Sequence, residues 1–168
     1  MNWADHIKAE LQKRIVNESI PRIKKCLEKL NIDEIWSRQN EACNSVGNLI
    51  LHLNGNVRQW LLSGMGGAKD TRKRDEEFAQ RAIIPKSELI KMLDALAVDL
   101  IPFKNKLDGK ALLNLYTVQG YPETGISAVI HVIEHFSYHT GQIALITKIL
   151  KSESLEFYSG QDLSQVNS

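Results

Sequence analysis

Apolar residues recur at intervals of three and four in four long segments of the chain, the pattern of helices that bury one face. Pro21 lies inside the first segment and should kink or split that helix, because proline lacks a backbone N–H. Ser45, Ser87 and Thr124 are placed to cap the second, third and fourth helices. The four segments are 3–30, 45–63, 87–107 and 124–150. Four amphipathic helices without a set of strands predict an all-α four-helix bundle.

The connections on either side of the third helix are longer than the 2–8 residues usual in helix bundles. They leave room for a long crossover and for loops that form a mouth over a site. Leu112–Gly120 is too short for a bundle helix and is expected to be extended. Lys69–Gln80 carries many charges of both signs and is expected to be solvated or loosely helical. We expect residues 1–150 to form a single domain, followed by a polar C-terminal tail at 151–168.

The arginines of the second helix and of the connection after it have two interpretations. They are surface partners of the acidic residues between positions 70 and 77, or they form a clamp for a carboxylate substrate. The first interpretation is preferred, because charged runs are usually solvated. The residues concerned are Arg58, Arg72, Arg74 and Arg81.

The composition is that of an ordinary globular protein, with 168 residues, 43% hydrophobic and 24% charged. Its 21 Lys+Arg and 20 Asp+Glu give a net charge of +1, which offers no bulk attraction to nucleic acid or to a membrane surface. The first ten residues lack the apolar core of a secretory signal, and no apolar run is long enough to span a membrane. We therefore expect a cytoplasmic protein, in which Cys26 and Cys43 are free thiols without a redox role.

Three histidines lie four residues apart in the fourth helical segment: His131, His135 and His139. Each four-residue step rotates about 40° and rises about 6 Å, so the imidazoles form a slanting row. Two neighbours in this row can bind one metal ion, but His131 and His139 are about 12 Å apart along the axis and cannot share it. The helix therefore offers a pair of ligands, and further ligands must come from elsewhere.

His52 stands in the apolar face of the second helix, where an imidazole without a partner is costly to bury. A lone histidine in such a place is usually a core residue satisfied by one hydrogen bond. Here a second helix already carries a histidine pair with metal-ligand spacing. The combination favours a metal site between facing helices of the bundle.

Two stretches of the sequence resemble the DinB-like (YfiT-like) superfamily of metal-binding four-helix bundles. They are LHL around His52, followed by RQWLL, and EHFSYHTGQI from Glu134 to Ile143. The resemblance extends over roughly residues 3–150 and implies a metal-binding domain whose three ligands are His52, His135 and His139. Three imidazoles and a water would make an open site, for which Zn or Ni is the expected metal, although Co, Fe and Cu also fit.

Characterised members of this superfamily include S-transferases and isomerases that use low-molecular-weight thiols. The resemblance thus implies a metal-dependent thiol S-transferase acting on a small molecule, with no catalytic side chain assigned. The main alternative is a non-catalytic metal-binding or structural homodimer, with Trp36, Trp60 and the fourth helix at its interface. A metal-dependent hydrolase ranks lower, because the sequence supplies no obvious general base.

One further motif competes for the same histidines. His131–His135 reads HVIEH, the HxxEH pattern of inverzincin peptidases, in which Glu134 would be the general base. That interpretation leaves His52 and His139 without a role, and its acidic third ligand would have to come from the short polar tail. We therefore expect His131 to be a packing residue or an acid or base near the site, and Glu134 to lie on the helix surface.

Overall fold

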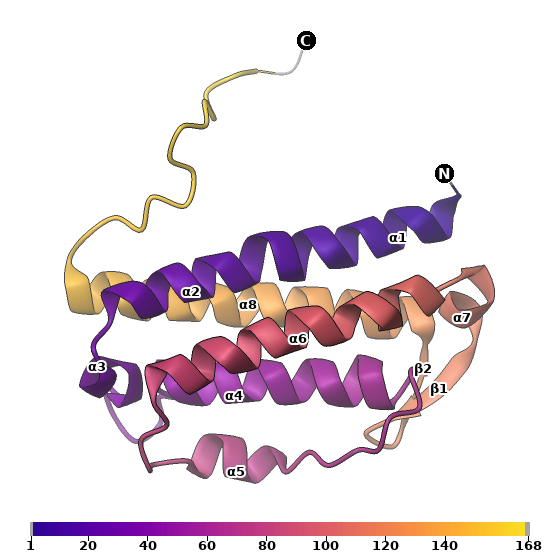
Figure 1. The fold of residues 1–168 in the computed structure, drawn as a ribbon, viewed down its shortest axis with the longest axis horizontal. Coiled ribbons are helices and arrows are strands. Elements are labelled where there is room, and N and C mark those ends of the chain that lie inside the picture. Colours follow the sequence, from indigo (N-terminus) through magenta and orange to yellow (C-terminus); the bar gives the residue numbers. More distant parts are fainter. Residues whose placement is uncertain (1, 167–168) are drawn as a thin grey trace.

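Four long helical rods form the bundle in the computed structural model, which describes residues 2–166 (Figure 1). The all-α fold is therefore confirmed. The first rod comprises α1 (Trp3–Leu11), η1 (Gln12–Ser19) and α2 (Ile20–Lys29); the second comprises α4 (Val46–Val57) and η2 (Arg58–Ser63); the third is α6 (Lys86–Lys106) and the fourth is α8 (Gly125–Lys151). Within the described residues, no helix combines the length and the apolar character needed to cross a bilayer.

The first rod continues through Pro21 instead of breaking there. The turns before the proline are π-helical, and the Ile20 N–H donates to the carbonyl of Ile15, five residues earlier. A wider turn relieves the crowding between a proline ring and the carbonyl four residues before it. The distortion expected at Pro21 thus takes the form of η1, and the helix is not split.

Side-chain caps fix the starts of the second and fourth rods. Ser45 Oγ accepts a hydrogen bond from the Asn48 backbone N–H, and Thr124 Oγ1 accepts one from Ser127. The caps expected at Ser45 and Thr124 are confirmed. The cap expected at Ser87 is wrong, because the third rod begins at Lys86, directly after Pro85, and has no side-chain cap.

The connections between the rods contain short ordered elements. They are α3 (Ile32–Trp36), α5 (Arg74–Ala79), α7 (Gly109–Leu113), β1 (Leu115–Val118) and β2 (Tyr121–Thr124). The two strands form an antiparallel hairpin in which Leu115 pairs with Thr124 and Val118 pairs with Tyr121. Gln119 and Gly120 have positive φ angles of 53° and 84°, which suit a tight two-residue turn. In Figure 1, α5 lies outside α4, and the hairpin lies at one end of the bundle.

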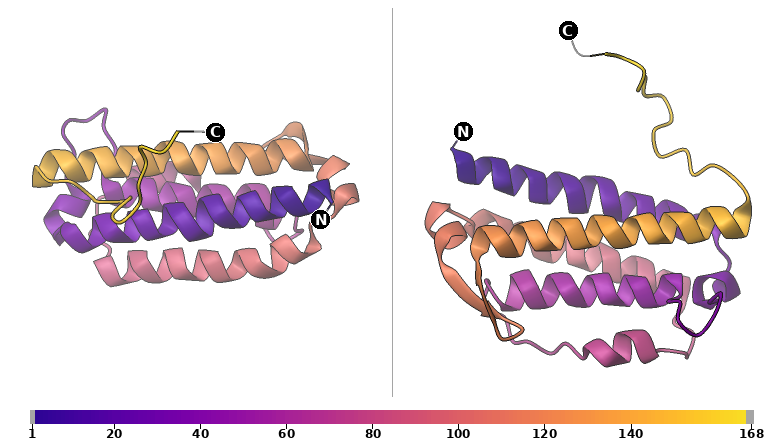
Figure 2. Two further views of the ribbon diagram at one scale, coloured as in Figure 1. Left: turned by 90° about the horizontal axis from the view of Figure 1, so that it is seen from above. Right: turned by 180° about the vertical axis from the view of Figure 1, so that it is seen from behind.

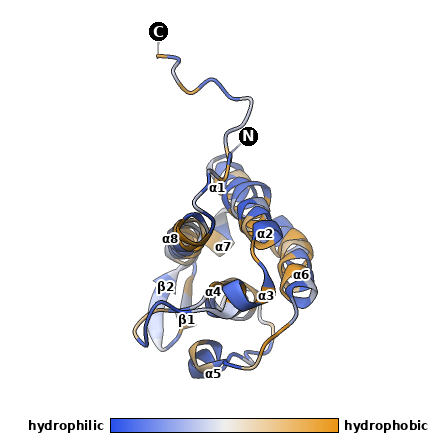
Figure 3. Ribbon diagram, turned by 90° about the vertical axis from the view of Figure 1, so that its left-hand side faces the viewer, coloured by the Kyte–Doolittle hydropathy of each residue, from blue (hydrophilic) through white to orange (hydrophobic). Residues whose placement is uncertain are grey.

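The core fills the space between the rods, where Leu53, Leu93, Phe136 and Ile143 are all buried. Figure 3 looks along the bundle and shows α8 beside α4, with α5 on the outer side of α4. The start of the C-terminal tail also packs on the bundle, because Leu155 is buried. Beyond it the chain extends away from the helices (Figure 2).

Candidate metal centre

The three histidines expected to bind metal come together between two rods. His52 belongs to α4, whereas His135 and His139 belong to α8, and one ligand atom from each lies within 4.8 Å of the others. The Nε2 atoms of His52 and His135 are only 2.8 Å apart. The candidate third ligand, expected to come from outside α8, thus lies on the neighbouring helix α4.

Hydrogen bonds on the far side of two rings select their tautomers. His139 Nδ1 lies 2.6 Å from Gln142 Oε1, and it donates its proton to that amide oxygen. His52 Nδ1 lies 2.9 Å from Glu77 Oε2 and 3.1 Å from Arg72 Nη2. It must donate to Glu77, because an unprotonated Nδ1 would place its lone pair against the carboxylate oxygen. In both neutral rings, Nε2 is then the nitrogen that can bind a metal.

The Nε2 atoms of His52 and His135 are close enough for an N–H···N hydrogen bond, in which neutral His135 carries its proton on Nε2 and donates it to His52. With a cation in place of that proton, both Nε2 lone pairs would be directed at the same ion. Ligand nitrogens about 2.1 Å from a tetrahedral ion are about 3.4 Å apart, so small ring movements would admit a metal. The donor set therefore fits a divalent transition metal.

The protonation states also suit metal binding. Burial, assisted by the neighbouring histidines and Arg72, lowers the pKa of His135 to about 3. Burial lowers the pKa of His139 as well, partly opposed by its bond to Gln142. Neutral imidazole is the form that binds metal ions, so these two rings are ready to coordinate at neutral pH.

A buried ion pair supports His52 from behind. Arg72 Nε donates to Glu77 Oε1 at 2.7 Å, and Arg72 Nη2 donates to Oε2 at 2.9 Å. The two side chains are only 3% and 10% exposed. Burial raises the pKa of Glu77, but its bonds to Arg72 and His52 outweigh this effect and hold the pKa below the usual value. Glu77 is therefore a carboxylate that accepts the His52 proton.

The expected pairing of Arg72 with a nearby acidic residue is found, but the expectation that the 69–80 segment is solvated is wrong for Arg72 and Glu77. Sequence reasoning also missed the contact of Glu77 with His52. The segment offers four acidic residues, Asp70, Asp75, Glu76 and Glu77, and no local pattern distinguishes the one that reaches His52. The three other arginines have different partners. Arg58 pairs with Asp99, Arg74 lies over the Phe78 ring, and Arg81 donates to two carbonyl oxygens.

His131 stands apart from the group of three. Its ring stacks on Trp60 with centroids 3.8 Å apart, and it lies parallel to the His135 ring at 5.5 Å. Glu134 is exposed on α8. The inverzincin pattern requires His131 and His135 to share an ion, but the ligand atoms that gather around His135 are those of His52 and His139. The packing role expected for His131 agrees with this arrangement.

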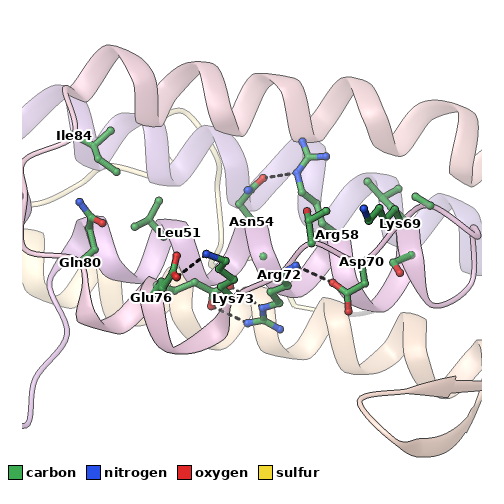
Figure 4. Close-up of a pocket in the computed structure, with 16 residues that line it drawn as sticks. Leu51, Asn54, Arg58, Lys69, Asp70, Arg72, Lys73, Glu76, Gln80 and Ile84 are labelled. Atoms are coloured by element: carbon green, nitrogen blue, oxygen red, sulfur yellow. Dashed lines mark hydrogen bonds and ion pairs between the residues drawn. The ribbon is translucent and has the colours of Figure 1, made fainter.

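One pocket adjoins the group of histidines, and a second reaches the ion pair behind His52. One, of about 200 Å³, is lined by His131, Glu134, His135 and Tyr138, so it reaches a member of the group directly. A larger one, of about 450 Å³, lies between α4 and the connection that contains α5. Figure 4 shows Arg72 and Asp70 beside α4 in this larger pocket, which also reaches Glu77. It therefore touches the support of His52 and not the three imidazoles.

Comparisons with known proteins agree with the DinB-like resemblance of the motifs around His52 and at Glu134–Ile143. Residues 4–160 match the profile of the family described as "Protein of unknown function (DUF1572)". A crystal structure of a conserved protein from Enterococcus faecalis superposes with a TM-score of 0.72 at 14% identity, covering 91% of this chain and 99% of that one. The DinB-like protein YjoA from Bacillus subtilis gives a TM-score of 0.66 at 14% identity, covering 91% and 97%. No curated protein matches the chain.

At 14% identity, these two structures show that the chain shares their fold and nothing about its function. The sequence profile covers nearly the whole described chain. The expected resemblance to DinB-like proteins is confirmed by the fold of YjoA. The chain therefore belongs to the DUF1572 family, and it shares its fold with the DinB-like protein YjoA.

Proposed function

We propose that this protein binds one divalent transition metal, Zn or Ni, through His52, His135 and His139, and uses it as a metal-dependent thiol S-transferase. The observation that carries the metal site is the meeting of three imidazoles from two helices within 4.8 Å. Bonds to Glu77 and Gln142 further orient two of the rings. Nitrogen ligands in this number are typical of catalytic sites, which keep a coordination position open.

The chemistry follows from the open position. A metal bound by three neutral imidazoles lowers the pKa of a coordinated thiol, so that the thiolate is available at neutral pH. The side chains of this protein would hold the geometry: Glu77 fixes His52, and Phe78 covers the His52 ring at a centroid distance of 4.6 Å. A small molecule would approach through the pocket that His135 lines.

The alternative is a non-catalytic metal-binding or structural homodimer. It is favoured by a row of exposed apolar side chains along α8, at Ile130, Tyr138, Leu145 and Ile149. Trp60, which we expected at such an interface, is only 6% exposed and stacks on His131, so it is not available to a partner. A dimer would therefore form through α8. Sedimentation should show a monomer for Leu145→Glu if this interface is correct and an unchanged species if it is not.

Metal binding is tested by titrating the metal-free protein with Zn²⁺ in competition with a chelator. We expect one ion per chain, and His135→Ala should lower the affinity by at least about 100-fold because a ligand is lost. His6→Ala, at an exposed position of α1, is the matched control and should bind like the wild type. A wild type that binds no metal, or a His135→Ala variant that binds equally well, contradicts the proposed site.

Thiol chemistry needs a separate measurement. The Co²⁺-loaded protein should develop a sulfur-to-cobalt charge-transfer band when a small thiol is added, and a conjugation assay with an electrophile should then depend on His135. Metal binding without a thiol band or turnover would instead support the non-catalytic alternative.

A further inference from the structure

We propose that Glu77 is a positioning residue of the metal centre, and that the connection carrying it (residues 68–84) becomes fixed in place when metal binds. The inference rests on the proposed metal site. It assigns a role to a charged segment that no motif marks and that lies outside the four rods. The argument starts from the contacts that Glu77 makes in three directions.

The first contacts join Glu77 to His52 and Arg72. The carboxylate accepts from His52 Nδ1 at 2.9 Å and from both Nε and Nη2 of Arg72. A carboxylate behind a ligating histidine fixes the ring and makes its other nitrogen more basic. The Arg72 fork holds the carboxylate itself, so Glu77 meets His52 in one orientation.

The second direction is toward the backbone of α4, which has a glycine where the ion pair approaches it. A Cβ at Gly55 would overlap Glu77 Oε1 and lie 3.0 Å from Arg72 Nε. Gly55 is helical and its φ is not in the left-handed region. Its missing side chain is therefore explained by clearance for the ion pair and not by a special backbone conformation.

The third set of contacts attaches the rest of the connection to α4. Asn48 Nδ2 donates to the carbonyls of Glu77 and Gln80, at 2.8 and 3.1 Å. Gln59 accepts from Arg72 Nη1 and donates to Asp70. In contrast, no residue of α5 (Arg74–Ala79) is fully buried, although the Glu77 side chain is only 10% exposed. The connection is thus held mainly by polar contacts centred on Glu77, and such segments open more easily than a packed core.

These contacts link metal binding at the three histidines to closure of the connection (residues 68–84) over α4, and the link must act in both directions. If closure of the connection places Glu77 behind His52 and thereby strengthens metal binding, metal must strengthen closure by the same factor. Both halves of this statement can be measured without any enzymatic assay.

The first measurement compares Zn²⁺ affinities in competition with a chelator. Glu77→Gln keeps an acceptor but loses the charge, and it should lower the affinity about tenfold; Glu77→Ala removes both and should lower it about 100-fold. Glu76→Gln is the matched control, because the Glu76 side chain is 69% exposed and pairs with exposed Lys73. If both Glu77 variants bind like the control, the positioning role is refuted. If the wild type binds no Zn²⁺, the proposed function fails instead.

The second measurement is limited trypsin digestion of the full chain, with and without Zn²⁺. Lys73 and Arg74 lie in the connection, and cleavage there should slow at least about tenfold on metal loading. In Glu77→Ala at saturating Zn²⁺, this protection should be lost. Equal cleavage of the wild type in both states would refute the coupling. Should Glu77→Ala fail to fold, as judged by circular dichroism, Gly55→Ala provides the same test by displacing the ion pair.

Discussion

At the scale of single residues, the use of both nitrogens distinguishes His52 from a core histidine. It is 4% exposed, yet its Nδ1 contacts Glu77 and its Nε2 contacts His135. One hydrogen bond would satisfy a buried neutral imidazole. The second contact joins it to another imidazole, whose Nε2 can donate a proton to His52 or share a metal ion with it. Whether His52 can bind a metal therefore depends on which of its two ring nitrogens carries the proton.

The pH dependence of folding follows from His135. The unfolded residue titrates near its ordinary value of about 6.5, whereas burial lowers the folded pKa to about 3. Between these values the unfolded chain binds a proton that the folded chain does not. In the absence of metal, the free energy of unfolding should thus fall as the pH drops below about 6.5, by up to about 1.4 kcal/mol per pH unit from this group.

The check is urea unfolding in chelator near pH 7 and near pH 5, comparing the wild type with His135→Gln. The variant should lose less stability over this interval, because its side chain does not titrate. An equal loss in both proteins would show that His135 is not the group responsible.

Gly55→Ala tests whether the Arg72–Glu77 pair needs the space left by the missing side chain at Gly55. Alanine is about 1 kcal/mol more favourable than glycine in a helix interior, so this substitution would stabilise the fold if nothing occupied that space. Here the new methyl group would displace the Arg72–Glu77 pair, and we expect weaker Zn²⁺ binding by about tenfold. The affinity is measured by chelator competition. Unchanged affinity would mean that the pair shifts without affecting His52.

How much of the centre could be predicted depends on the kind of information each residue carries. Helical spacing predicted a ligand pair among His131, His135 and His139, and the family motif selected His135 and His139. His52 was predictable from its place in an apolar face and from the motif around it. Glu77 was not, because its contact with His52 depends on how an irregular connection folds back over α4. Nothing in the charge pattern separates it from exposed Glu76.

At the scale of elements, the rods were more predictable than their connections. Apolar periodicity and the caps at Ser45 and Thr124 are local signals, and the structure bears them out. The hairpin and α5 depend on contacts with distant parts of the chain. In the hairpin, Gly120 adopts a positive φ, but one glycine among polar and aromatic residues did not specify two strands.

The contact of α3 with α4 gives a matched pair of glycine substitutions. A Cβ at Gly47 would lie 2.7 Å from the Trp36 ring, which is also held by its 3.1 Å bond to the Ile84 carbonyl. Gly47→Ala should therefore destabilise the fold by about 1–3 kcal/mol. At Gly141 a Cβ meets nothing within 4 Å, so Gly141→Ala should stabilise it by about 0.5–1 kcal/mol. Urea unfolding measures both, and the same sign for both would contradict this explanation.

At the scale of the whole molecule, the bundle provides a frame and the connection provides a support for the site. α4 and α8 pack side by side, and α5 lies on the outer side of α4 (Figure 3). The two rods carry all three imidazoles, and Phe78 of α5 packs against the His52 ring. Proteins only 14% identical share this fold. Because one fold can host many functions, the proposed function rests on the three histidines and not on the bundle.

The most direct test of the metal site is a crystal structure of the Zn²⁺-soaked protein, with anomalous data collected on both sides of the zinc edge. The account predicts one anomalous peak about 2.0–2.1 Å from a nitrogen of each of His52, His135 and His139. A peak bound by other side chains, or three imidazoles without any peak at saturating Zn²⁺, would contradict it.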